Sequence, residues 1–182
     1  MNIKSFTALT TLAASVAVTT APMAQASPYA VDSAHNQLIT AIRSTGIQFI
    51  VNGEWCAKDK FHGYYWAAKN EMVICQDARN RRNRSQHEVR WSANDLDTLR
   101  HEAQHLIQDC MVGSYRDGKL GAVYKDPIGL AKNILGTKSI YSILKAYSDK
   151  SDHTKVMELE AFSVAAMNNP MDQVADIKKF CF

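Results

Sequence analysis

Hydrophobic and polar residues follow two periods along the chain, and these periods divide it into predicted helices and strands. Apolar residues spaced three or four apart predict helices over residues 31–43, 95–111, 127–135, 138–147 and 153–167. Short β-branched and aromatic runs predict strands over residues 47–51, 54–57, 64–68 and 72–76, with Asn52-Gly53 as a hairpin turn. We therefore expect an α+β fold in which a small antiparallel sheet packs on the 95–111 helix and on further C-terminal helices.

The first residues have the pattern of a secretory signal peptide. Lys4 precedes a weakly apolar run over residues 6–18, and Ala24-Gln25-Ala26 is a small-x-small cleavage site. We expect residues 1–26 to be removed and residues 27–182 to form a single domain that is secreted or periplasmic. No later apolar run in the sequence has the length of a membrane span.

Composition and charge limit the classes of molecule that the protein is expected to bind. The 182 residues are 46% hydrophobic and 21% charged, as in an ordinary globular domain, and the formal net charge is only +3. Residues 78–90 form a polar stretch without interleaved aromatics that contains Arg79, Arg81, Arg82 and Arg84. Because the net charge is small, we interpret this stretch as a solvated loop and expect no nucleic-acid partner.

The predicted helix over residues 95–111 carries a pattern suited to metal catalysis. Its apolar residues gather on one side, whereas His101 and His105 fall on the opposite side. Two imidazoles four residues apart on a helix can both reach one zinc ion, and Glu102 is then placed to act on water beside that ion. Ser92, followed three residues later by Asp95, is a capping-box pattern that would start the helix.

The five residues from His101 to His105 read H-E-x-x-H and resemble the active-site helix of the zincin metallopeptidases. Metzincins continue this motif with a glycine and a third histidine, but this chain has Gln108 and Met111 at those places, which excludes that subclass. The resemblance implies one zinc ion per chain, Glu102 as general base, and a peptide or protein substrate. In zincins the strand before this helix borders the cleft and pairs with substrate, a place taken here by residues 72–76.

A catalytic zinc site of this kind needs a third protein ligand. Beyond the helix the only glutamates are Glu158 and Glu160. Glu160 would lie in an apolar stripe, where a carboxylate is unfavourable unless it is paired or metal-bound, so we expect Glu160 to be the ligand. Its surroundings also resemble the third-ligand helix of small zincins, which implies a zincin of the glutamate type. Glu158 and Asp126 are the alternatives, and His153 is a candidate for stabilising the transition state.

The cysteines are predicted to be structural. An even number in an exported domain favours disulfides, and no C-x-x-C motif is present. Cys56 and Cys75 lie on strands of one predicted sheet, so we expect them to pair. Cys110 lies on the packed side of the 95–111 helix, and we expect it to bind Cys181 near the C-terminus.

A non-catalytic secreted binding protein is the alternative function, with the zinc structural or absent. The small size of the chain and the lack of a motif that defines a substrate favour it. A catalytic zinc ion keeps one coordination position open for water. A fourth protein ligand on the metal would therefore favour the non-catalytic alternative.

Overall fold

A computed structural model describes residues 31–57, 61–76, 88–113 and 117–182 and confirms the α+β fold. One sheet contains β1 (Gln48–Val51), β2 (Gly63–Trp66) and β3 (Glu71–Ile74). The helices are α1 (Ser33–Ser44), α2 (Ala93–Met111), α3 (Pro127–Ile134), α4 (Gly136–Ala146), α5 (Asp152–Met167) and α6 (Pro170–Phe180). The predicted signal peptide and Arg79, Arg81, Arg82 and Arg84 lie outside the described residues.

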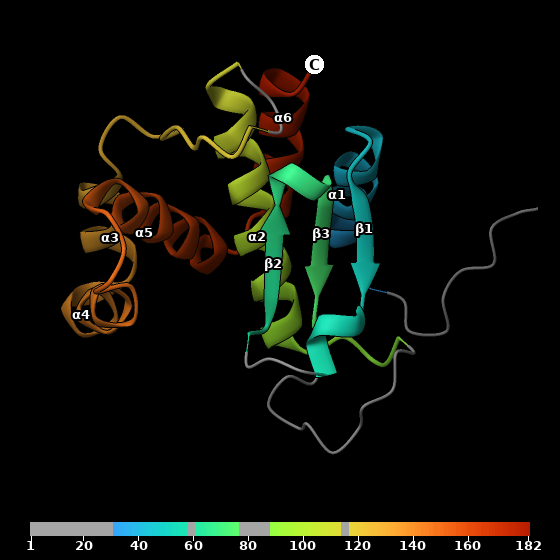
Figure 1. The fold of residues 1–182 in the computed structure, drawn as a ribbon, viewed down its shortest axis with the longest axis horizontal. Coiled ribbons are helices and arrows are strands. Elements are labelled where there is room, and N and C mark those ends of the chain that lie inside the picture. Colours follow the sequence, from blue (N-terminus) through green and yellow to red (C-terminus); the bar gives the residue numbers. More distant parts are fainter. Residues whose placement is uncertain (1–30, 58–60, 77–87, 114–116) are drawn as a thin grey trace, which may run out of the picture.

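Helix α2 lies at the centre of this arrangement. Together with α1 it covers one face of the sheet, while α3, α4 and α5 extend to the side of α2 away from β3 (Figure 1). It packs against β2, β3, α5 and α6. The core between sheet and helices is formed by fully buried residues of several elements, namely Leu38, Ile42, Met72, Ile74, Leu99, Leu106, Ile107 and Ile177. None of the helices in the described ranges is long and apolar enough to cross a membrane.

The sheet is mixed, so the expected antiparallel meander is wrong. Strand β3 pairs with β1 in parallel and with β2 antiparallel. Asn52-Gly53 does not form a hairpin, and Glu54–Ala57 form a short 3-10 helix, η1, in place of a returning strand. The reason is a long-range pair: Asn52 exchanges hydrogen bonds of 3.1 and 2.8 Å with Gln76, which ties the end of β1 to the end of β3. Strand β3 therefore occupies the place beside β1.

The strand order is β1-β3-β2, so β3 is central and residues 72–76 present no free edge to a substrate. The expectation that they border the cleft with an unpaired edge is wrong, and among the described strands β2 lies nearest to α2. A Cβ atom at Gly63 would lie 2.7 Å from the Thr98 methyl carbon and 3.2 Å from Glu102 Cγ. Glycine at this position therefore lets β2 approach the face of α2 that carries Glu102.

Local predictions for α2 and the cysteines are confirmed. Ser92 accepts a hydrogen bond from the Asp95 backbone, and the Asp95 carboxylate accepts one from the Ser92 backbone, which forms the capping box. The disulfides join Cys56 to Cys75 and Cys110 to Cys181. The second bridge fixes the C-terminal end of the chain to the last turn of α2.

Candidate metal and catalytic site

His101, His105 and Glu158 bring their ligand atoms together where α2 packs against α5. These atoms all lie within 4.8 Å of one another. Glu158 Oε2 is 3.3 Å from His101 Nε2 and 3.5 Å from His105 Nε2, and the two Nε2 atoms are 3.1 Å apart. The two histidines come from adjacent turns of α2, as the sequence predicted, and the carboxylate comes from α5.

Glu160, the expected third ligand, does not join this group, and that expectation is corrected by the structure. Its side chain is fully buried. It accepts hydrogen bonds of 3.0 to 3.2 Å from four N–H groups, those of the Gln104 and Gln108 side chains and of the Val123 and Tyr124 backbone. The sequence showed correctly that a carboxylate in an apolar stripe needs partners, but these partners are N–H donors and not a metal ion. Asp126, the other alternative, caps α3 through the Gly129 backbone.

Glu160 acts on the site through Gln108. The Gln108 amide nitrogen donates to Glu160 Oε1 and to the Met157 carbonyl, both at 3.0 Å. Because both acceptors require the NH₂ group, the amide oxygen turns toward His105, where it lies 2.8 Å from Nδ1. Nδ1 of His105 therefore carries a proton, and Nε2 faces Glu158. Such partners orient a metal-binding histidine and fix its tautomer.

The donor set fits a zinc ion. Glu158 Oε2 is a buried oxygen that faces Nε2 of both histidines. Together with two imidazole nitrogens it forms a two-histidine, one-carboxylate set, which is typical of catalytic zinc. His101 is held by packing, since its ring lies 4.3 Å from the Phe162 ring centroid and 4.7 Å from that of His105. Its Nδ1 atom is buried without a hydrogen-bond partner, so the two histidines differ in what orients them.

Two recesses give access to this group from opposite ends of β2. The first has a volume of about 270 Å³, and its lining includes Phe61, Gly63, His101, Glu102 and Tyr147. The second has a volume of about 350 Å³, and its lining includes Tyr65, Trp66, His105 and Glu158. A ligand can therefore approach the group from either side.

Comparison with known proteins identifies the family of the chain but no activity. Residues 29–182 match a family model described as a domain of unknown function, DUF8637. The chain belongs to this family. No curated protein and no solved structure gives a significant match. The geometry of the site is therefore the basis for assigning a chemistry to this DUF8637 domain.

Burial and charge set the protonation of the DUF8637 site. Burial raises the pKa of Glu102 above its ordinary range, although the charges of His101 and His105 oppose this. Burial alone would lower the pKa of His105, but hydrogen bonding and charge from Glu158 outweigh it and raise that pKa to about 9. Burial would also raise the pKa of Glu158, yet the two histidines hold it well below its usual range. A buried carboxylate such as Glu102, whose pKa is raised, takes up a proton more readily than an exposed one, which suits a general base.

Tyr147, not His153, is the residue beyond the metal group that the DUF8637 fold places at the site. The exposed His153 side chain is bonded to the Leu120 carbonyl, 2.8 Å from Nε2, and lines neither recess. Tyr147 follows α4 and lines the recess of His101 and Glu102. Burial and the nearby Glu158 carboxylate raise its pKa, so its hydroxyl remains a proton donor. In the sequence Tyr147 appeared only as one residue of an apolar helix face, which gave no functional signal.

Proposed function

We propose that this chain is an exported zinc-dependent peptidase. The observation that carries the proposal is the meeting of His101, His105 and Glu158 beside Glu102, at a point open to two recesses. Among the described residues this group offers three ligands, the number that leaves a fourth position for water. The two disulfides are consistent with an oxidising, extracytoplasmic location.

Zinc bound by these three side chains would lower the pKa of water and polarise a carbonyl group. Glu102 then serves as general base: its carboxylate takes a proton from the attacking water and passes it to the departing amine nitrogen. The backbone N–H of Tyr65 bonds the Glu102 carboxylate and fixes its direction. Gln108 keeps the His105 ring oriented during this exchange.

Tyr147 contributes a hydrogen bond to the developing negative charge. Its side chain lines the same recess as Glu102, and its hydroxyl stays protonated because burial and the Glu158 carboxylate raise its pKa. A donor positioned in a buried site stabilises an oxyanion more than it stabilises the neutral carbonyl of the substrate. This role replaces the one expected for His153.

The test compares the zinc-loaded mature chain with Glu102→Gln on a peptide library made from a digested proteome. We expect the wild type to cleave, a chelator to abolish cleavage, and zinc to restore it. Glu102→Gln should keep one zinc ion per chain and lose activity about 10²-fold to 10⁴-fold. Glu88→Gln is the matched control, because Glu88 bonds the Trp91 indole away from both recesses. Full activity in Glu102→Gln, or no cleavage by the zinc-loaded wild type, would contradict the proposal.

A further inference from the structure

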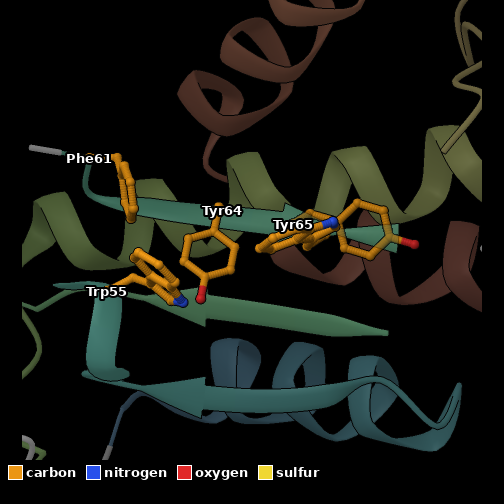
Figure 2. A pocket seen from close by; sticks show the side chains of 5 residues that line it. Trp55, Phe61, Tyr64 and Tyr65 are labelled. Atoms are coloured by element: carbon orange, nitrogen blue, oxygen red, sulfur yellow. The ribbon is translucent and has the colours of Figure 1, made fainter. Parts of the chain in front are cut away.

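Five aromatic side chains line a groove that the proposed chemistry does not use. They are Trp55, Phe61, Tyr64, Tyr65 and Trp66, and the groove has a volume of about 330 Å³. Figure 2 shows Trp55 of η1 and Phe61 and Tyr64 gathered around one end of β2, with Tyr65 farther along the strand. Trp55 and Trp66 are both 41% exposed, and Phe61 is 37% exposed. Concentrated exposed aromatic surface of this kind marks a binding site.

The aromatic groove shares lining residues with both recesses of the candidate catalytic site. Phe61 also lines the recess of His101 and Glu102. Tyr65 and Trp66 also line the recess of His105 and Glu158. Strand β2 thus borders both the metal group and the aromatic groove. Successive side chains of an extended polypeptide point to opposite faces of its backbone. A substrate that lies extended in either recess can therefore place a neighbouring side chain in the aromatic groove.

The lining also indicates which chemistry the groove accepts. The Tyr64 hydroxyl donates to Glu71 and the Tyr65 hydroxyl to Asp109, both at 2.6 Å, so these groups are already engaged. The rings therefore offer apolar surface more than hydrogen bonds, which disfavours a sugar. Lys69 Nζ lies 3.8 Å from the Trp66 ring centroid and brings positive charge to that ring, which disfavours a cation.

We propose that the aromatic groove binds an aromatic or large aliphatic side chain of the polypeptide substrate, close to the bond that is cut. This proposal rests on the proposed peptidase function and adds a substrate class to it. The edge-to-face packing of Phe61 on Tyr64, with centroids 5.4 Å apart, and of Tyr64 on Trp66, 6.4 Å apart, holds the lining rings in place. An apolar side chain can therefore bind to preformed surface.

The experiment measures cleavage preference in the same proteome-derived peptide library. The zinc-loaded wild type should favour aromatic or large aliphatic residues over alanine about tenfold at one position near the cut. Trp55→Ala and Trp66→Ala should each reduce this ratio to near one, and Trp66→Phe should retain most of it. Tyr141→Ala is the control, since Tyr141 is 67% exposed and lines none of the three cavities. The proposal is overturned if the wild type shows no such preference, or if both alanine variants keep the wild-type preference.

A binding measurement separates failure of the groove from failure of the peptidase proposal. Fluorescence anisotropy on Glu102→Gln compares a labelled hexapeptide with two central phenylalanines and its dialanine analogue. Tighter binding of the phenylalanine peptide, lost in Glu102→Gln combined with Trp55→Ala, supports the groove even if no peptide is cleaved. Equal binding of both peptides overturns it. Binding of N-acetylglucosamine hexamer in place of either peptide would assign the groove to glycans and also overturn it.

Discussion

Gln108 offers the sharpest test of how the zinc site is built, because the chain contains a matched partner for it. Gln104 and Gln108 lie on adjacent turns of α2, both are fully buried, and both donate at 3.0 Å to Glu160 Oε1. Only Gln108 also accepts from His105 Nδ1. Replacing each glutamine by methionine keeps side-chain length and helix propensity and removes the amide.

The expected magnitudes differ between the two variants. Losing the partner of a metal-binding histidine lowers metal affinity about 10-fold to 100-fold, so Gln108→Met should weaken zinc binding by about 1.4 to 2.7 kcal/mol. Gln104→Met should leave zinc affinity unchanged. Both variants remove a hydrogen bond to the buried Glu160 carboxylate, so each should lower the free energy of unfolding of the metal-free protein by about 1 to 3 kcal/mol.

Zinc affinity is measured at pH 7 by competition with a chromophoric chelator, and metal-free stability by urea unfolding. Nitrogen-15 NMR of the imidazoles adds an independent readout in the metal-free protein above pH 9, where His105 becomes neutral. The neutral ring should carry its proton on Nδ1 in the wild type and lose this preference in Gln108→Met. Equal zinc affinity in the two variants would refute the orienting role of Gln108. A neutral His105 ring that carries its proton on Nε2 in the metal-free wild type would refute it as well.

Three further predictions concern catalysis, stability and pH. Tyr147→Phe should lower kcat about 10²-fold to 10³-fold while zinc content stays the same, and an unchanged kcat would remove Tyr147 from the mechanism. Replacing Cys110 and Cys181 together by alanine opens a link between residues 71 apart in the sequence and should lower the free energy of unfolding by about 4 kcal/mol, measured in urea. The folded protein holds the His105 proton more tightly than the unfolded chain does, because folding raises the pKa of His105 from about 6.5 to about 9. This difference stabilises the metal-free fold fully below about pH 6.5 and is lost as pH rises toward 9, so unfolding should become easier over this range. A melting temperature that is flat or rises over this range contradicts the ion pair with Glu158.

Helix α2 could be predicted from the sequence because the residues that determine its start, its packed face and its site lie close together in the chain. The capping box, the apolar stripe and the placement of His101, Glu102 and His105 all depend on residues within a few turns of one helix. Both disulfides were also predicted, because Cys56 and Cys75 were expected on strands of one sheet and Cys110 on the packed face of α2. The first pairing is confirmed although Cys56 lies in η1 and not on a strand.

The features that the sequence did not reveal depend on contacts between distant segments. Glu158 and Glu160 both lie on α5, and what separates their roles is the way α5 packs on α2, together with the N–H groups of Val123 and Tyr124. The turn at Asn52 likewise follows a partner 24 residues away, Gln76, which outweighs the local hairpin preference. Local propensity contains no information on either contact.

Anomalous X-ray diffraction at the zinc edge, on crystals of the zinc-loaded mature chain, tests the central claim most directly. The account predicts one zinc ion per chain, bound by Nε2 of His101, Nε2 of His105 and a carboxylate oxygen of Glu158, with no fourth protein ligand. Glu160 should remain bonded to its four N–H donors. Zinc bound by Glu160, a fourth protein ligand, or no zinc at this group would contradict the account.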